Sequence, residues 1–171
     1  MKRFLIVISL LAALILCGCS ATIGGEYGEP INDLAEAVAD GDAEDYLDVF
    51  EDKYIEDLSE YYTIISDKGL EATVTEMLDI TKAYNKENCG AFTSISVTEV
   101  SKKKLDEFPA DAVYTGDFEP DGRVEDIYEV TVSYVIKGFK GSTDAKEAKL
   151  IVYSVDGDYY LHPMHLLFVF Q

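Results

Sequence analysis

Positive charge is scarce in this sequence. Lysine and arginine together number 14 against 33 aspartate and glutamate residues, which gives a formal charge of −19. Nucleic acids and anionic lipid head groups are bound through clustered positive charge. We therefore expect no nucleic acid partner and no binding of lipid through charged side chains.

Apolar runs long enough to cross a membrane are also missing. The one long apolar stretch, residues 4–16, follows Lys2 and Arg3 and ends in small residues, whereas a helix that crosses a bilayer needs about 20 apolar residues. A basic start, a short apolar middle and a small-residue end are typical of a secretory signal peptide. This segment therefore predicts export and not a permanent membrane span.

Cysteine is rare, and two of the three cysteines stand together at the end of this stretch. The tetrapeptide Leu16-Cys17-Gly18-Cys19 resembles the lipobox of bacterial lipoproteins. The resemblance implies that residues 1–18 are removed. Acyl chains such as palmitate on Cys19 would then hold the protein on the extracytoplasmic face of the cell membrane. Each buried methylene contributes about 0.8 kcal/mol to such an anchor. The alternative is ordinary secretory cleavage nearby, which leaves Cys19 as a plain thiol.

Removal of residues 1–18 takes away two positive charges, so the formal charge changes from −19 to −21. Three glycines before Pro30 predict that residues 19–30 form a flexible tether. Residues 31–171 have the length of a single domain. Cys89 is the only cysteine within it, so no disulfide can form there, and we expect a buried, inert thiol.

Helical periodicity dominates the first half of this domain. A first helix is predicted to end at residues 40–42, and Asp42 can cap a second one. A third helix is predicted from about Lys68 to Lys86. The expected apolar stripes are Ile31, Leu34, Ala35 and Val38, then Leu47, Phe50, Tyr54, Leu58 and Tyr61, then Leu70, Val74, Met77, Thr81 and Tyr84.

Beyond Gly90 the apolar period changes to two, which is typical of strands with one wet face. Asp156-Gly157 stands between apolar runs and predicts a two-residue hairpin turn. We also expect a short helix over Lys102–Phe108 and a buried final strand over residues 165–171. The face of the strand at residues 127–138 is predicted to carry Tyr128, Val130, Val132, Tyr134 and Ile136.

Paired helices in "INDLAEAVADGDAEDYLDVF", followed by strands that close on "VDGDYYL", resemble the NTF2-like α+β fold of many secreted bacterial lipoproteins. The resemblance implies N-terminal helices packed on a curved antiparallel sheet over residues 31–171. Members of that family often place tryptophan in the closing hairpin, where Tyr159 stands here. This chain has no tryptophan.

Two acidic runs, residues 40–51 and 117–128, have part of the spacing of a calcium loop. In the first, Asp45 stands where such a loop needs glycine, and in the second Tyr128 stands where it needs a bidentate carboxylate. A helix cap explains the first run and a plain turn explains the second, and neither explanation requires a bound ion. We predict no calcium site.

Histidine is limited to His162 and His165, which stand three residues apart. Zinc would need at least one further ligand nearby, and no local motif supplies it. The sequence therefore predicts no metal and no cofactor.

Three tyrosines are candidates for the walls of a small-molecule pocket. A two-residue turn pairs Val155 with Asp158, which places Tyr159 on the apolar face of its hairpin. Tyr134 lies on the apolar face of the preceding strand, and Tyr54 belongs to the second helical stripe. Rings with a hydroxyl tip suit an apolar pocket between helices and sheet. The alternative is that Tyr54, Tyr134 and Tyr159 simply fill the core.

Two function classes follow. The first is a non-catalytic, membrane-anchored module that binds an unknown small molecule or protein. The second is an enzyme of the NTF2-like type with a buried carboxylate as general base, but Glu129, the nearest candidate, lies by parity on the face opposite Tyr128. We favour the binding module and predict no catalytic residue. The fourteen acidic residues from Glu26 to Glu60, against the single Lys53, form either a patch for a basic partner or solvated helix faces.

Overall fold

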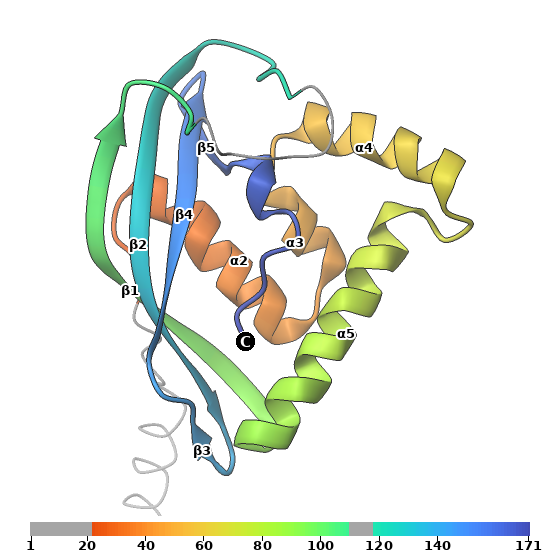
Figure 1. The fold of residues 1–171 in the computed structure, drawn as a ribbon, viewed down its shortest axis with the longest axis vertical. Coiled ribbons are helices and arrows are strands. Elements are labelled where there is room, and N and C mark those ends of the chain that lie inside the picture. Colours follow the sequence, from red (N-terminus) through yellow and green to blue (C-terminus); the bar gives the residue numbers. More distant parts are fainter. Residues whose placement is uncertain (1–21, 110–117) are drawn as a thin grey trace, which may run out of the picture.

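The computed structural model describes residues 22–109 and 118–171. Helices come first and strands follow, so the class is α+β, as predicted (Figure 1). The helical elements are η1 (Glu26–Gly28), α2 (Glu29–Asp40), α3 (Ala43–Asp48), α4 (Asp52–Ile65), α5 (Gly69–Cys89) and, at the end, η2 (Pro163–His165). The strands are β1 (Phe92–Leu105), β2 (Val124–Gly138), β3 (Gly141–Ser142), β4 (Lys146–Val155) and β5 (Asp158–Leu161).

The segment before α2 is packed on the domain. Ile23 is buried, its N–H donates to Asn32 Oδ1 at 2.9 Å, and Asn32 Nδ2 donates to the Ile23 carbonyl oxygen at 2.9 Å. Gly28 fits closely here, because a Cβ at that position would stand 2.7 Å from Ile23 Cγ2. The sequence predicts a flexible tether as far as Pro30, whereas the chain from Ile23 onward is part of the fold.

Local signals determine both ends of α2. Pro30 lies in the first turn, where a missing N–H costs nothing. Gly41 ends the helix in a left-handed conformation with φ 72°, and its N–H donates to the Ala37 carbonyl oxygen at 2.8 Å. The apolar side of the helix, which includes Ile31 and Leu34, is fully buried against the sheet side of the core.

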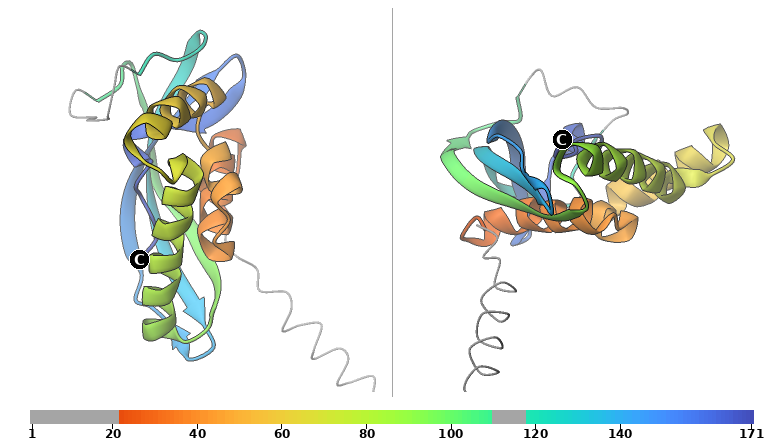
Figure 2. Two further views of the ribbon diagram at one scale, coloured as in Figure 1. Left: turned by 90° about the vertical axis from the view of Figure 1, so that its right-hand side faces the viewer. Right: turned by 90° about the horizontal axis from the view of Figure 1, so that it is seen from below.

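Asp42 caps α3 as predicted, because its Oδ1 accepts from the N–H groups of Glu44 and Asp45 at 3.0 and 3.3 Å. The prediction of one continuous second helix is wrong, because the chain leaves the helical conformation between Asp48 and Asp52. There the Val49 carbonyl oxygen accepts from Leu161 N at 2.9 Å. This bond to β5 turns the chain, and α4 projects away from the sheet (Figures 1 and 2).

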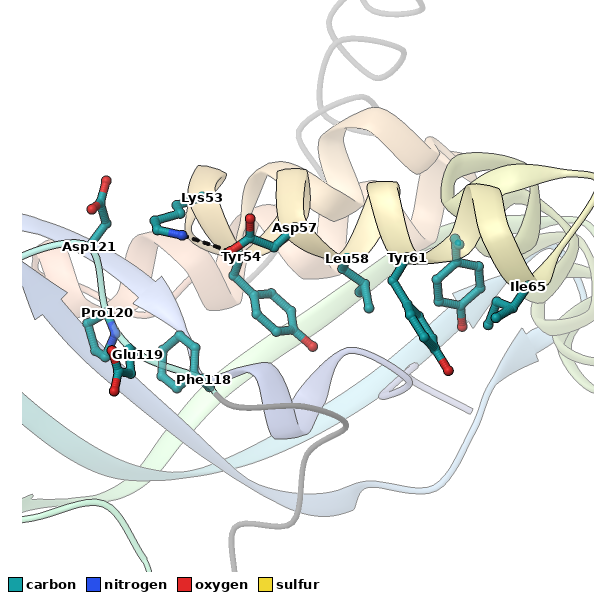
Figure 3. A pocket seen from close by; sticks show the side chains of 11 residues that line it. Lys53, Tyr54, Asp57, Leu58, Tyr61, Ile65, Phe118, Glu119, Pro120 and Asp121 are labelled. Carbon is teal, nitrogen blue, oxygen red and sulfur yellow. Dashed lines mark hydrogen bonds and ion pairs between the residues drawn. The ribbon is translucent and has the colours of Figure 1, made fainter.

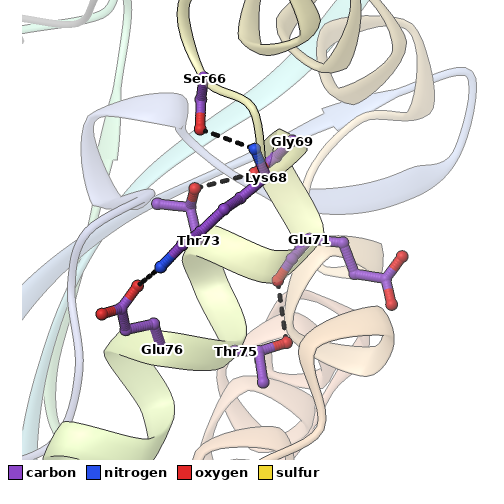
Figure 4. A network of polar contacts seen from close by, with 7 residues as sticks. All are labelled: Ser66, Lys68, Gly69, Glu71, Thr73, Thr75 and Glu76. Carbon is purple, nitrogen blue, oxygen red and sulfur yellow. Dashed lines mark hydrogen bonds and ion pairs between the residues drawn. The ribbon is translucent and has the colours of Figure 1, made fainter.

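Short-range hydrogen bonds fix the turn between α4 and α5 (Figure 4). Lys68 N donates to Ser66 Oγ at 3.2 Å, and Thr73 Oγ1 donates to the Gly69 carbonyl oxygen at 2.8 Å. Gly69 has φ 77°, which favours glycine. Lys68 Nζ lies 2.9 Å from Glu76 Oε2, but both side chains are exposed and such a pair adds little stability.

The sheet is antiparallel with the strand order β1-β2-β4-β5, and β3 pairs with β2. The predicted hairpin register is confirmed, since Val155 pairs with Asp158. The two turn residues, Asp156 and Gly157, have φ of 53° and 100°. A two-residue turn of type I′ requires positive φ at both positions.

The short helix predicted over Lys102–Phe108 is wrong, because β1 continues through these residues to Leu105. The register shifts by a bulge between Glu99 and Ser101, and Lys104 then pairs with Tyr128 of β2. A local helical preference is weak compared with the backbone hydrogen bonds that a long neighbouring strand provides.

The final strand predicted over residues 165–171 is also wrong, although the segment is buried as expected. After η2 the chain runs without regular structure between the helices and the sheet (Figure 1). Tyr46 Oη donates to the carbonyl oxygens of Leu166 and Phe168 at 2.8 and 2.7 Å. Asn85 Nδ2 donates to the Phe170 carbonyl oxygen at 3.3 Å. Side chains from two helices thus satisfy the backbone groups that a strand would otherwise pair.

Candidate functional site

A cleft of about 960 Å³ opens between α4 and residues 118–121 (Figure 3). We call it the α4 cleft, and residues 118–121 the 118–121 wall. Apolar and aromatic side chains of α4 line one side. The wall contributes an aromatic ring, a proline and two carboxylates. The lining residues are Lys53, Tyr54, Asp57, Leu58, Tyr61, Tyr62, Ile65, Phe118, Glu119, Pro120 and Asp121.

The α4 side of the cleft is unusual because two of its large apolar side chains, Tyr61 and Ile65, are open to solvent. Tyr61 is 54% exposed, Ile65 55% and the neighbouring Ile64 79%. Leu58 is the only residue of α4 that is buried. Tyr54, Leu58, Tyr61 and Ile65 stand at helical spacing and project from one side of the helix (Figure 3). Contiguous exposed apolar surface of this kind marks interaction sites in soluble domains.

The 118–121 wall is held by a small aromatic core on the other face of β4. Phe118 is buried, with its ring centroid 5.7 Å from Tyr54, 5.7 Å from Tyr153 and 5.2 Å from His162. Phe108 joins the same group, 4.8 Å from His162. Tyr54 therefore belongs both to this core and to the cleft.

Glu51 fastens the wall to the rest of the domain. Its carboxylate is only 6% exposed, and it accepts a hydrogen bond from Tyr153 Oη at 2.8 Å and another from Asp121 N. Burial raises the pKa of Tyr153, and the Glu51 carboxylate raises it further, so the phenol stays protonated and donates. Glu51 itself does not line the α4 cleft.

The charges around the α4 cleft are mainly negative. Asp57, Glu119 and Asp121 line it, and Lys53 is the only cation among the lining residues. Lys53 Nζ lies 2.7 Å from Asp57 Oδ2, so its charge is compensated within the helix. The Asp57 pair raises the pKa of Lys53, which therefore remains a cation at neutral pH.

His162 and His165 are buried and accept hydrogen bonds from the backbone. His162 Nδ1 accepts from Met164 N at 3.2 Å, and His165 Nε2 accepts from Ile151 N at 2.8 Å. Burial lowers the pKa of each ring to about 4, and for His165 the neighbouring His162 adds to the effect. Within the described part of the chain, no group of three His, Cys, Asp or Glu residues is placed to hold a metal ion.

The three tyrosines named from the sequence do not come together. Tyr54 lines the α4 cleft. Tyr134 lies in the main core, 4.9 Å from the Phe170 ring, and its hydroxyl donates to the Gln171 carbonyl oxygen at 3.3 Å. Tyr159 stacks on Tyr128 at 6.4 Å near the end of the sheet, and neither it nor Tyr134 lines the cleft.

The C-terminal segment fills part of the space between the helices and the sheet. Phe170 is fully buried and belongs to the cluster that joins the helices to the sheet, as does Leu166. These side chains occupy the space in which the sequence predicts the pocket. The α4 cleft lies elsewhere, between α4 and the 118–121 wall.

Cys89 and Glu129, two further residues named from the sequence, do not line the α4 cleft. Cys89 is buried at the end of α5 as a free thiol. Glu129 is partly exposed and lies 3.5 Å from Lys149 Nζ on the neighbouring strand. Cys19 and Asp117 lie outside the described residues.

The sequence predicts neither the connecting role of Glu51 nor the 118–121 wall, although both lie within the acidic runs at residues 40–51 and 117–128. Glu51 follows Val49 and Phe50, both buried, so a carboxylate directly after two core residues was the available signal. For the wall no comparable signal exists, because Pro120, Asp121 and Gly122 form a plain turn sequence.

Within residues 22–109 and 118–171, no helix combines the length and apolar character needed to cross a membrane. No family model matches the chain, and no curated protein and no solved structure matches it.

Proposed function

We propose that this protein is a lipid-anchored, extracytoplasmic binding module that engages its ligand or partner at the α4 cleft. Three separate parts make up the proposal: the anchor at Cys19, the NTF2-like character of the domain, and the binding role of the cleft. Each has its own support.

The anchor is supported by the sequence around Cys19. The basic start, the short apolar stretch and the Leu16-Cys17-Gly18-Cys19 motif agree with one another. The packed position of Ile23 adds a geometric consequence. Four residues span at most about 14 Å, so an acylated Cys19 would keep the domain close to the bilayer.

The NTF2-like character is supported by the arrangement of layers. Helices α2, α3 and α5 lie on one side of a curved antiparallel sheet (Figures 1 and 2). In this chain, however, the C-terminal segment with Phe170 occupies the space between the layers. A ligand of this domain would therefore bind outside that space.

One observation carries the binding role: the exposed apolar residues of α4 face a cleft whose opposite wall is fixed by Glu51. An enzymatic role has less support. Glu51 is the buried carboxylate nearest to the cleft, but it accepts from Tyr153 and Asp121 and does not line the cleft. A general base must reach its substrate.

The anchor is tested by mass spectrometry of the N-terminal peptide from membrane-extracted protein. We expect an acylated Cys19 in the wild type and loss of the acyl chains in Cys19→Ala. Cys17→Ala is the matched control, because it alters the other cysteine of the motif and should leave acylation intact. An unmodified N-terminus at another residue, or equal effects of both variants, contradicts the anchor.

The binding role is tested by a photo-crosslinking amino acid placed at Tyr61 in the intact protein within its cells of origin. Tyr84 of α5 is the matched control, since it is 50% exposed against 54% for Tyr61 but does not line the cleft. We expect a crosslinked product at position 61 and not at position 84. Equal products at both positions, or none at either, contradict a binding role for the cleft.

A further inference from the structure

The side of α4 that faces the cleft carries two exposed apolar side chains, Tyr61 and Ile65, and the charge around them indicates what can cover them. Tyr54, Leu58, Tyr61 and Ile65 span twelve residues, or about 16 Å along the helix axis between the first and the last. Tyr54 and Leu58 are packed at one end of this stripe, and Tyr61 and Ile65 are exposed at the other. The 118–121 wall runs beside this stripe with the ring of Phe118 and with Pro120. A linear stripe that faces a single wall fits another rod-shaped element laid alongside α4.

The rim of the α4 cleft is acidic. Helix α4 carries four acidic residues and only Lys53 as a cation, and Lys53 is paired with Asp57. Glu119 and Asp121 add two more carboxylates from the wall. The whole chain has a formal charge of −19, so an approaching partner experiences an attractive field only if it is basic.

A second copy of this chain fits the cleft poorly. Two copies would bring their acidic rims together, and like charges placed opposite each other disfavour association. A neutral apolar ligand would leave the carboxylates of the rim without any complementary group. A basic amphipathic partner complements both features.

We infer that the α4 cleft receives a basic amphipathic helix of a protein partner, with its apolar side on Tyr61 and Ile65 and its lysines or arginines against Asp57, Glu119 and Asp121. This inference rests on the proposed binding role of the cleft. The partner helix packs beside α4 as helices do in globular proteins, about 8 to 10 Å between axes. Electrostatic attraction sets the rate of encounter, and burial of the apolar stripe holds the complex.

The probe is a pair of labelled synthetic helices of about 14 residues. In one, leucines repeat at helical spacing with lysines elsewhere, and in the other glutamates replace the lysines. Binding is measured by fluorescence anisotropy to the mature chain in phosphatidylcholine nanodiscs, with empty nanodiscs as background. We expect the lysine helix to bind, the glutamate helix not to bind, and affinity to fall when salt is raised.

Two matched pairs of variants locate the site. Ile65→Ser should weaken binding of the lysine helix by at least about tenfold, whereas Ile80→Ser on α5 should not, although Ile80 is 65% exposed. Glu119→Lys should weaken it by a similar factor, whereas Glu87→Lys on α5 should have a much smaller effect. Both variants of the second pair change the total charge by the same amount, but only Glu119 lines the cleft. A difference between them therefore reports local charge complementarity.

Several results would overturn the inference. Equal binding of both synthetic helices, absence of binding by the lysine helix, or equal effects of the cleft and α5 variants each exclude a basic helix at this site. If a Tyr61-specific crosslink is still found in cells, the cleft binds a partner of different chemistry and the proposed function stands. If that crosslink is absent as well, both fail.

Discussion

The carboxylate of Glu51 accepts hydrogen bonds from two elements that are distant in the chain, Tyr153 in β4 and the backbone N–H of Asp121. Because Glu51 also stands directly before α4, one side chain connects the helix, the sheet and the wall of the α4 cleft. A buried donor that loses its acceptor incurs its full desolvation cost. The stability of the domain and the shape of the cleft therefore depend on the same residue.

We predict that Glu51→Ala lowers the free energy of unfolding by about 2 to 3 kcal/mol, because it leaves Tyr153 Oη buried without an acceptor and removes the bond that holds Asp121 N. Glu56→Ala, on the exposed side of α4, is the control and should change stability by less than about 0.5 kcal/mol. Urea unfolding followed by circular dichroism measures both. If Glu51→Ala changes the free energy of unfolding as little as Glu56→Ala does, Glu51 does not connect α4, the sheet and the wall.

The two histidines make a second prediction at this scale. Both rings accept a backbone N–H through a ring nitrogen, which only a neutral imidazole can do at that atom. Their pKa values are about 4 in the fold, against about 6.5 in the unfolded chain. Between these values the unfolded chain binds protons that the folded chain does not, so the stability present above pH 6.5 is lost as the pH falls toward 4.

Protonation of each histidine should lower the free energy of unfolding by about 3 kcal/mol as the pH falls from 6.5 to 4. Protonation of the many carboxylates acts at the same time, so the contribution is isolated by a variant. His165→Gln keeps an oxygen that can accept from Ile151 N but cannot titrate, and its urea-unfolding free energy should depend less steeply on pH between 6.5 and 4 than that of the wild type. Parallel curves for the two proteins would contradict the prediction.

At the scale of elements, the 118–121 wall is docked through the turn that follows it. A Cβ at Gly122 would stand 2.6 Å from Val155 Cγ1 and 2.9 Å from Asp156 Oδ2. Val155 is buried and β-branched, so it has little freedom to move away. The lack of a side chain at Gly122 therefore lets the wall approach the β4–β5 hairpin.

We predict that Gly122→Ala lowers the free energy of unfolding by about 1 to 3 kcal/mol through overpacking. Gly24→Ala is the control, because a Cβ at Gly24 meets nothing within 4 Å. Unfolding midpoints in urea compare the two. If the alanine at position 122 is as harmless as the one at position 24, the wall does not rest on the hairpin in the way described.

The sequence predicts those elements whose limits are set locally. Gly41 ends α2 through its own left-handed conformation, and Asp156-Gly157 sets the hairpin register through its own positive φ. The sequence predictions fail where a residue distant in the chain determines the local backbone conformation. The break before α4 depends on the bond from Leu161 N to Val49, which no local pattern contains.

The candidate site divides in the same way. The apolar stripe of α4, including Tyr54, follows from helical spacing in the sequence. Its two halves differ in the structure, because Tyr54 and Leu58 pack on the core whereas Tyr61 and Ile65 stay exposed beside the cleft. The C-terminal segment, whose Phe170 fills the space beside Tyr134, takes a place in the core that spacing alone does not assign. A single sequence does not show which of two apolar segments occupies a given space, because both have the composition of a core.

At the scale of the whole molecule, the start of the described chain and the α4 cleft are well separated. The start of the described chain, coloured red, lies beside the sheet at one side of the molecule, and α4 projects from the opposite side (Figure 1 and the right-hand view of Figure 2). If Cys19 carries the anchor, the α4 cleft is directed away from the bilayer, where a partner in the aqueous phase can reach it.

The net charge governs the last prediction. Four side-chain ion pairs join described residues: Lys53–Asp57, Lys68–Glu76, Lys104–Asp126 and Lys149–Glu129. All involve an exposed lysine and contribute little each. Against them stands a formal charge of −19, whose mutual repulsion opposes the compact state. Added salt therefore screens more repulsion than attraction, since the Debye length falls from about 30 Å at 0.01 M to about 10 Å at 0.1 M.

We predict that the urea midpoint at pH 7 rises when sodium chloride is raised between these concentrations. The variant Glu87→Gln, which removes one exposed negative charge from the last turn of α5, should begin from a higher midpoint and gain less from the salt. Urea is the required denaturant, because guanidinium is itself a salt and would mask the effect. A midpoint that falls with salt would mean that the local ion pairs outweigh the repulsion of the whole chain, in which case the acidic surface stabilises the fold instead of merely attracting a basic partner.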